Sequence, residues 1–363
     1  MAQEIVVDKE FEESVTEADE ELRKILESRK AEIKVIGVGG AGGNTLSRLM
    51  QVGIVGAETI AVNTDAQDLL YTDSDRKVLI GRDLTGGLGA GANPKIGLEA
   101  AKESKKDIKK AIEGADMVFI TCGLGGGTGT GASPIIADIA KKNGSLTVGI
   151  VTLPFTMEGK QRMKNAQEGL ENLENVVDTL IVIPNDKLLE IVPDVSILTA
   201  FKVADEILVN AVKGIAELIT KPGLVNLDFA DIRAVMGSGG LAMIGMGESD
   251  TENRAIESVE KSLNNPLLDV DIEGATGALI NISGGEDITI KECQEIVEAV
   301  SSKINPDAKI IWGAQVIKEL GDTIRSMLII TGVKSTQIYG PGKTFTTEKK
   351  KEVERILGVE FLE

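Results

Sequence analysis

Short apolar runs alternate with amphipathic segments through the first half of the chain. Residues 33–40 read IKVIGVGG, and AGGNTLSRLMQVG follows with apolar residues at helical spacing. This alternation predicts an α/β fold with a Rossmann-like, parallel, doubly wound sheet. Ligands bind such sheets at the carboxyl ends of the strands. We predict strands at 33–40, 57–65, 76–81, 115–124, 146–154 and 178–185, and helices at 41–53, 96–114, 132–144 and 159–175.

A long helical pattern from about Leu198 to Leu218 separates this half from the rest of the chain. Its apolar residues cover much of the circumference, which predicts a helix buried between two bodies, and Lys221-Pro222-Gly223 ends it. The pattern that follows predicts a smaller α+β domain. We therefore predict a charged helical extension at 1–30, the doubly wound domain at 31–197, the central helix at 198–222, the α+β domain at 223–335 and a tail at 336–363.

Composition excludes several kinds of chemistry. The 363 residues include 39 Lys+Arg and 57 Asp+Glu, a net charge of -18 that disfavours nucleic acid and anionic membranes as direct partners. The sequence has no histidine, so His metal sites, Ser-His-Asp triads and His acid–base catalysis are excluded. Cys122 and Cys293 lack metal-binding spacing and indicate a reducing compartment. With no signal peptide and no apolar run of ~20 residues, we expect a cytoplasmic protein.

The first glycine-rich loop has the spacing of a dinucleotide-binding motif. Gly37, Gly39 and Gly42 form G-x-G-x-x-G between a predicted strand and a predicted helix. Asp65 falls near the end of the next strand, where a ribose-binding acid would lie. This loop alone leaves an NAD-dependent oxidoreductase as a competing interpretation.

A second loop favours a ligand with several phosphates. GGGTGTG, at residues 125–131, also joins a strand to a helix, and its glycines permit close approach of the backbone to a ligand. Backbone N–H groups at a helix N-terminus suit phosphate oxygens. A third glycine-rich stretch spans 86–93. Any one of the three is readily explained as a tight turn, but together they predict a triphosphate ligand.

At GGGTGTG the sequence resembles the tubulin/FtsZ family, of which this is the signature loop. The resemblance covers about residues 32–335 and implies the tubulin/FtsZ fold, in which a GTPase domain is joined by the central helix to the α+β domain. It also implies a GTPase that polymerises in the cell-division ring, and the acidic N-terminal helix is similar to archaeal members. Other matching stretches are GVGGAGGN (37–44), AVNTDAQ (61–67), GLGAGANP (87–94), TLPFTMEGKQR (152–162), IPNDKL (183–188) and LVNLDFADIRAVM (224–236).

The resemblance implies that backbone N–H groups bind the phosphates of GTP or GDP. Residues 90–92 would close over the terminal phosphate, and two threonine hydroxyls would add donors. The implied phosphate-binding residues are Gly40, Ala41, Gly42, Gly43, Asn44, Ala90, Gly91, Ala92, Gly126, Gly127, Thr128, Gly129 and Thr130.

For the base, the resemblance implies four side chains. Phe201 would stack on guanine, although its pattern alone indicates a core aromatic residue. Asp205 would accept hydrogen bonds from the guanine N1–H and amino groups, which adenine lacks. Asn185 and Asn63 would assist around the base.

Glu158 and Arg162 lie four residues apart, so on a helix they would share one face. Spacing alone favours a surface ion pair. The resemblance instead implies that Glu158 contacts the ribose and that Arg162 lies nearby.

The candidate catalytic acids, Asp228 and Asp231, follow the central helix, and Asn226 would support them. Spacing alone favours a helix cap plus a solvated acid. The resemblance implies that they polarise the attacking water at the nucleotide of the neighbouring subunit. We expect Mg²⁺ to be held mainly by phosphates and water, with no metal site made only of protein ligands.

The implied partners are further copies of this chain, in a head-to-tail filament, and a membrane-anchoring adaptor. Residues 353–363, VERILGVEFLE, have apolar residues at helical spacing and are the candidate adaptor-binding segment, although a frayed terminus explains them equally well. We expect no nucleic-acid partner, no membrane insertion, and concentration of the protein at the mid-cell division ring.

Overall fold

The computed structural model describes residues 31–333, apart from 192–195, 222, 226, 238 and 269–271. The predicted N-terminal extension, Asn226 and the predicted tail therefore lie outside the described residues. The chain divides into two units, Met1–Ala31 and Glu32–Glu363, and all that follows concerns the second.

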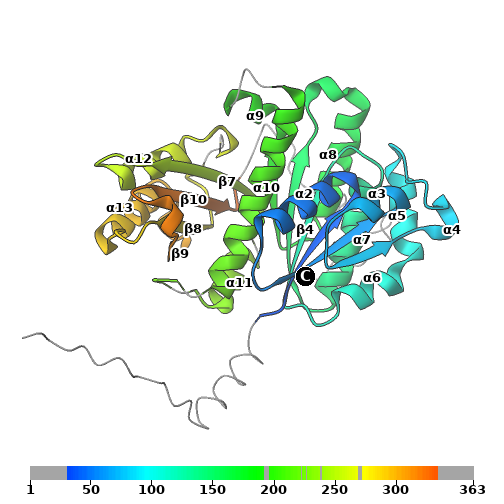
Figure 1. The fold of residues 1–363 in the computed structure, drawn as a ribbon, viewed down its shortest axis with the longest axis horizontal. Helices are drawn as coiled ribbons and strands as arrows, with labels where there is room; N and C mark the ends of the chain where they lie inside the picture. Colours follow the sequence, from blue (N-terminus) through cyan, green and yellow to red (C-terminus); the bar gives the residue numbers. More distant parts are fainter. Residues whose placement is uncertain are drawn as a thin grey trace, which may run out of the picture. The chain divides into compact units, whose positions relative to one another are not determined.

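Ten strands form one sheet in the order β3-β2-β1-β4-β5-β6-β7-β10-β8-β9 (Figure 1). The first seven of these are parallel to their neighbours, β10 is antiparallel to β7 and β8, and β9 is parallel to β8. This confirms the predicted parallel α/β sheet. The strands are β1 (Ile33–Val38), β2 (Ala57–Asn63), β3 (Arg76–Leu79), β4 (Met117–Gly123), β5 (Leu146–Leu153), β6 (Thr179–Pro184), β7 (Gly240–Ser249), β8 (Gly277–Gly284), β9 (Lys309–Val316) and β10 (Ile324–Thr331).

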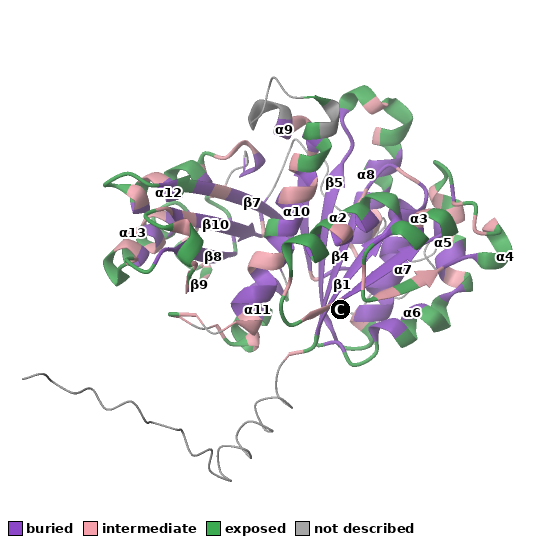
Figure 2. Ribbon diagram, viewed as in Figure 1, coloured by how far each residue is buried: buried purple, intermediate pink, exposed green. Residues whose placement is uncertain are grey.

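Helices cover both faces of the sheet, and the central strands between them are buried (Figure 2). Buried side chains of α2, α3, α9, α10 and α11 share one core, and those of α5 to α8, α12 and α13 share the other. The helices are α2 (Gly39–Val52), α3 (Ala66–Tyr71), α4 (Arg82–Thr85), α5 (Pro94–Glu103), α6 (Lys105–Ile112), α7 (Thr128–Lys142), α8 (Lys160–Glu174), α9 (Asn185–Ile191), α10 (Ile197–Thr220), α11 (Phe229–Met236), α12 (Arg254–Leu263) and α13 (Ile290–Ser301).

The single helix predicted at 96–114 is wrong, because the chain forms α5 and α6 there and divides them at Ser104. The Ser104 hydroxyl accepts a hydrogen bond of 2.9 Å from the Gly81 N–H, and the residue has φ -95° and ψ 19°. This tertiary bond fixes a bend in a segment whose apolar spacing is helical on both sides. Short helices α3, α4 and α9 were not predicted, since each is too short to show clear periodicity.

The predicted long helix is α10, which packs against both halves of the sheet. On the parallel side, Thr220 Oγ1 donates to Val55 O at 2.8 Å, and Glu206 forms an ion pair with Arg48 of α2. On the other side, Asn281 Nδ2 of β8 donates to Gly214 O at 3.2 Å. A Cβ at Gly214 would lie 2.3 Å from Met327 Cε, so glycine permits this close approach.

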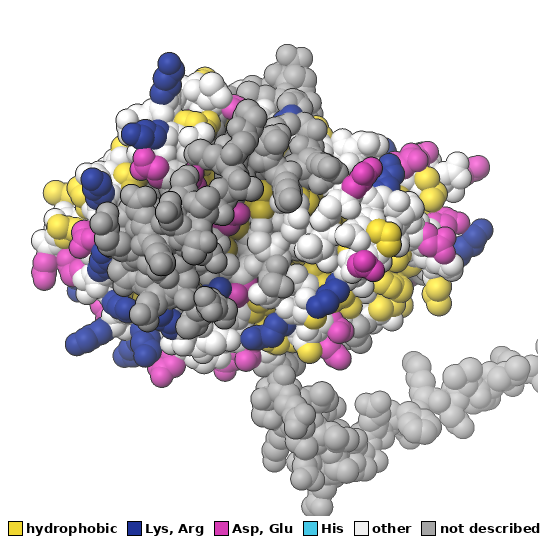
Figure 3. Space-filling view, turned by 180° about the vertical axis from the view of Figure 1, so that it is seen from behind, with side chains coloured by type: hydrophobic (Ala, Val, Ile, Leu, Met, Phe, Trp, Pro, Cys, Tyr) yellow, Lys and Arg dark blue, Asp and Glu magenta, His cyan; other side chains and the backbone are white. Residues whose placement is uncertain are grey.

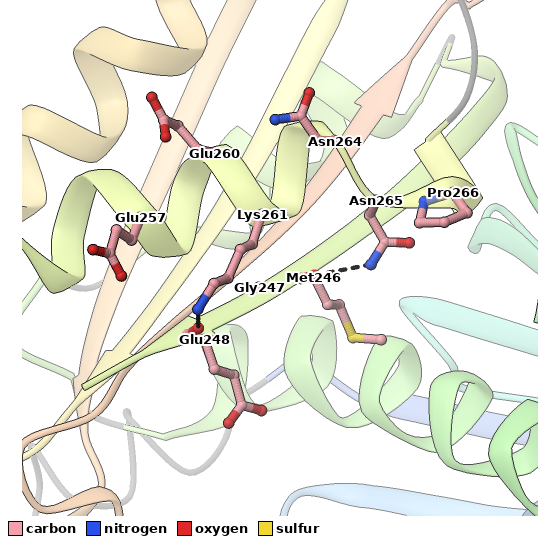
Figure 4. Close-up of a pocket in the computed structure, with 9 residues that line it drawn as sticks. All are labelled: Met246, Gly247, Glu248, Glu257, Glu260, Lys261, Asn264, Asn265 and Pro266. Carbon is pink, nitrogen blue, oxygen red and sulfur yellow. Dashed lines mark hydrogen bonds between the residues drawn. The ribbon is translucent and has the colours of Figure 1, made fainter. Parts of the chain in front are cut away.

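Strand β7 joins the two halves of the sheet and extends beyond its neighbour β6, which pairs with it only as far as Ala242. Beyond that point, side chains bond to the carbonyls of the open edge (Figure 4). Lys261 Nζ donates to Glu248 O at 2.8 Å, and Asn265 Nδ2 donates to Met246 O at 2.9 Å. The groove here, of about 690 Å³, is therefore explained as a protected sheet edge rather than a ligand site.

Close packing of α5 on α7 depends on Gly131, because a Cβ there would lie 2.0 Å from Pro94 O and 2.6 Å from Leu98 N. Both atoms belong to the backbone and cannot rotate away. We expect Gly131→Ala to lower the free energy of unfolding by about 1–3 kcal/mol, measured by urea denaturation without nucleotide. Gly274→Ala is the matched control, since Gly274 is exposed with no neighbouring atom within 4 Å. Equal stabilities of the two variants would contradict this packing argument.

Candidate functional site

Two helix N-termini meet at the carboxyl ends of the adjacent parallel strands β1 and β4. Helix α2 starts directly after β1, and α7 starts after the loop that follows β4. Neither helix has an acidic residue in its first turn, and neither N-cap side chain accepts a hydrogen bond from the helix. The N–H groups of both first turns are therefore available to an anion, and both helix dipoles favour one.

Glycine brings these two helix ends into contact. A Cβ at Gly39, where φ is 72°, would lie 3.0 Å from Gly129 N and 3.3 Å from Thr128 Cβ. A Cβ at Gly42 would lie 2.6 Å from Thr121 O at the end of β4. The first loop and the signature loop thus form one continuous backbone surface.

The third loop lies directly on the signature loop. A Cβ at Gly127 would lie 2.4 Å from Gly91 O and 3.0 Å from Ala90 Cβ. Asn165 of α8 holds the two loops together: its amide donates to Ala92 O at 3.1 Å and to Gly125 O at 3.4 Å. Sequence reasoning missed Asn165, although a polar residue on the apolar face of a helix was the available signal.

The two threonine hydroxyls of the signature loop already have protein partners. Thr128 Oγ1 lies 2.7 Å from Thr64 Oγ1, and Thr130 Oγ1 accepts the Gly125 N–H at 2.9 Å. These bonds shape the loop, and the backbone N–H groups remain its main donors toward a ligand.

Next to the helix ends, a cleft extends toward α10. Phe201 is 40% exposed and packs edge-to-face on Phe155, with ring centroids 5.3 Å apart at 82°. The cleft is lined by Ala41, Asn44, Gly123, Leu124, Thr152, Pro154, Glu158, Arg162, Asn185, Phe201, Ala204, Asp205 and Leu208. The residues predicted for the base, apart from Asn63, are therefore brought together beside the first phosphate loop.

Two acceptor side chains at this end of the cleft, Asp205 and Asn185, are poorly compensated for their burial. Burial raises the pKa of Asp205 to about 6; a hydrogen bond from the Thr45 hydroxyl lowers this pKa, and the charge of Glu206 raises it. Asn185 is buried, and its Oδ1 has no hydrogen-bond partner among the described residues. An unpaired buried acceptor costs free energy, so this end of the cleft is suited to a ligand with N–H donors.

Glu158 and Arg162 form the ion pair that spacing alone favoured, with Arg162 Nη1 2.8 Å from Glu158 Oε2. Glu158 Oε1 also accepts the Phe155 N–H at 2.9 Å. Because both side chains line the cleft, the ion pair and the predicted ribose contact are compatible, and the contact stays a prediction.

Asn63 does not lie with Asn185, which corrects the expectation that both surround the base. It ends β2, four strands and roughly 19 Å from β6, which Asn185 follows. Its amide donates to Asp68 Oδ2 at 2.6 Å and accepts the Thr64 N–H at 2.8 Å. Its neighbour Asp68 faces the first phosphate loop, since a Cβ at Gly40 would lie 3.3 Å from Asp68 Oδ2.

Cationic side chains contribute little to the cleft, because Arg162 is the one Lys or Arg residue among the described residues that line it. Lys and Arg side chains gather instead at the lower left of Figure 3. This is the side of α6, which lies at the lower right of Figure 1, because Figure 3 shows the molecule from behind. Helix α6 carries exposed Lys105, Lys106, Lys109 and Lys110. Attraction of phosphates therefore rests on backbone N–H groups rather than on lysine.

The acids Asp228 and Asp231 lie at the other end of the sheet. Asp228 is the N-cap of α11 without a side-chain cap bond, Asp231 is in the first turn, and both are exposed. Arg233 of the same helix donates to Asp116 O and Gly144 O, each at 3.4 Å, and these residues precede β4 and β5. The cleft follows these strands, so roughly 20 Å of strand separates it from the acids.

Among the described residues, no group of three or more Cys, Asp or Glu side chains is arranged to hold a metal ion. In the same part of the chain, none of the helices has the length and apolar character needed to span a membrane.

Comparisons with known proteins agree with this geometry. Residues 32–193 match the Tubulin/FtsZ family GTPase domain, and residues 240–334 match the FtsZ family C-terminal domain. Cell division protein FtsZ 1 of Thermococcus kodakarensis is 65% identical over 88% of this chain and 86% of its own length. Cell division protein FtsZ 1 of Methanocaldococcus jannaschii is 61% identical over 93% of this chain and 91% of its own length.

A solved structure described as an empty FtsZ dimer from M. jannaschii superposes with a TM-score of 0.85 and 59% identity, covering 92% of this chain and 98% of that one. None of these matches supports the alternative of an NAD-dependent oxidoreductase. The chain belongs to the Tubulin/FtsZ family and has both the GTPase domain and the C-terminal domain of the FtsZ cell-division proteins.

Proposed function

We propose that each subunit binds GTP and that Asp228 and Asp231 of the next subunit complete the hydrolytic site. The observation that carries this proposal is the position of the two acids, roughly 20 Å of strand away from the cleft of their own chain. Exposed carboxylates at one end and a phosphate site at the other meet only when a second copy stacks head to tail.

Exposed apolar side chains near both ends support such a contact. Leu70, Tyr71 and Leu88, beside the phosphate loops, are 69%, 77% and 87% exposed, and Leu224, near Asp228, is 62% exposed. Apolar side chains gathered beside a functional site are typical of interaction surfaces. The solved FtsZ structure from M. jannaschii is described as a dimer, which also favours self-association.

For nucleotide recognition, we propose that the N–H groups of α2 and α7 bind the phosphates and that residues 90–92 close over the terminal one. Guanine would lie against Phe201, with its N1–H and amino groups donating to Asp205. Asn185 Oδ1, which has no partner in the described structure, would accept from the ligand.

The residues around the phosphate loops fit an Mg²⁺ ion held mainly by phosphate and water. Asp68 Oδ2 lies near Gly40, and a Cβ at Gly89 would be 3.5 Å from Asp65 Oδ2, so both carboxylates would lie near the phosphates in the proposed site. When bound, Mg²⁺ would neutralise phosphate charge. Asp65 and Asp68 would orient its water ligands.

During hydrolysis, the proposed role of Asp228 and Asp231 is to orient and polarise the attacking water. Phosphoryl transfer depends mainly on positioning and electrostatics, so the lack of histidine is no obstacle. Loss of the terminal phosphate removes contacts to residues 90–92, next to the proposed subunit contact, and filaments containing GDP should therefore be weaker.

In the cell, we propose that the filament concentrates at the mid-cell division ring. The membrane-anchoring adaptor would bind the segment at 353–363, which lies outside the described residues. Unchanged ring placement in cells after deletion of residues 340–363 would exclude this role for the tail.

Protonation of Asp205 should weaken GTP binding. The raised pKa, about 6, means that the carboxylate is present above this pH and is lost as the pH falls through it. Affinity for GTP, measured by calorimetry on dilute protein, should therefore be highest near pH 7 and fall toward pH 5. In Asp205→Asn, GTP should bind about 10–100-fold more weakly, and this pH dependence should disappear.

Binding of xanthosine triphosphate shows whether Asp205→Asn changes base recognition or damages the nucleotide site in general. It has a carbonyl where guanine has the amino group, and the Asn side chain can donate to that carbonyl. We expect Asp205→Asn to bind xanthosine triphosphate better than GTP, reversing the wild-type preference. Equal losses for both nucleotides would mean that Asp205 does not read the base.

Mixing two inactive variants tests the split site. Asp231→Ala should bind GTP without turning it over, and Asp205→Ala should bind GTP poorly while retaining its acids. In an equimolar mixture, a subunit contact is complete when the Asp231→Ala variant provides the cleft and the Asp205→Ala variant provides the acids. Random pairing makes about one contact in four of this kind, so phosphate release should recover to about a quarter of the wild-type rate. A mixture no more active than its components, or an active Asp231→Ala protein, would overturn the proposal.

A further inference from the structure

Asn165 is a buried amide whose hydrogen-bonding groups are all used. It lies in the second turn of α8 and is 6% exposed. Its two N–H groups donate to Ala92 O at 3.1 Å and to Gly125 O at 3.4 Å, while its Oδ1 accepts from Gln161 Nε2 at 3.0 Å. A saturated buried amide holds its partners in one geometry.

Both acceptors belong to loops around the proposed phosphate site. Gly125 begins the signature loop, and Ala92 belongs to the loop proposed to cover the terminal phosphate. The middle of that loop, residues 91–93, is exposed, while Ala90 before it is buried and Asn93 is the N-cap of α5. The bond from Asn165 to Ala92 O ties this exposed middle part to the side chain that also holds Gly125 of the signature loop.

The simpler interpretation is that Asn165 only fastens α8 to the domain. Asn175, the C-cap at the other end of the same helix, has only a local role, since its Nδ2 donates to Glu171 O within α8 at 2.6 Å. Asn165 differs because it bonds outside its own helix to two loops that are distant in sequence. Removing it should disturb the loops more than the helix.

We propose that Asn165 is a positioning residue that holds residues 90–92 over the terminal phosphate and so sets the preference of the site for GTP over GDP. This inference rests on the proposed nucleotide site. GDP has no terminal phosphate for this loop to contact, so loosening the loop weakens the binding of GTP and leaves that of GDP nearly unchanged.

The test compares Asn165→Leu, which keeps the side-chain size and removes both donors, with Asn175→Leu as the matched control in the same helix. Affinities for GDP and for a slowly hydrolysed GTP analogue are measured on dilute protein, alongside the thermal midpoint. We expect the analogue to bind Asn165→Leu about tenfold more weakly, a change of about 1.4 kcal/mol, and GDP to bind within twofold of wild type. Asn175→Leu should lower the thermal midpoint without changing the ratio of the two affinities.

Asn165→Asp is a second variant of the same size, in case the apolar side chain prevents folding. It also removes both donors and places carboxylate oxygens against the two carbonyls, so it should show the same selective loss. Equal weakening of both nucleotides, or no weakening, would overturn the role of Asn165 while leaving GTP binding by the wild type intact. A wild type that binds neither nucleotide would instead overturn the proposed function.

Discussion

The contact between the N-termini of α2 and α7 is the constraint on which the rest of the site depends. Parallel pairing of β1 with β4 directs both helices from the same edge of the sheet, and Gly39 and Gly42 allow their first turns to touch neighbouring backbone. Larger residues at these positions would separate the helix ends. Because the first turns are uncapped and free of acidic residues, their N–H groups give an acidic chain an anion site without lysine.

The same parallel sheet separates the proposed nucleotide cleft from the proposed catalytic acids. Its strands place the nucleotide cleft at their carboxyl ends and α11, with its two exposed acids, at their amino ends. In the proposed mechanism, a single copy has both halves of a hydrolytic site and cannot join them. The proposed head-to-tail contact does not close on itself, so the same arrangement would link filament growth to GTP turnover and filament weakening to phosphate loss.

Much of the fold and of the candidate site was predictable, because the features involved are local in sequence. Alternating strands and helices, the glycine loops and the long helix α10 all follow from spacing within a few residues. Other features depend on contacts between distant segments: the hydroxyl of Ser104 that divides α5 from α6, the position of Asn63 four strands from Asn185, and the bonds from Asn165 to two loops. A sequence pattern does not show which distant backbone group a buried polar side chain will meet.

The central claim is that the active site forms between subunits, and the dependence of turnover on concentration tests it most directly. GTP hydrolysis with Mg²⁺ would be measured over a wide range of protein concentrations, with light scattering recorded on the same samples. The account predicts a rate per molecule near zero in dilute protein that rises together with scattering. A rate per molecule that stays constant at all dilutions would show a site complete within one chain and would contradict the account.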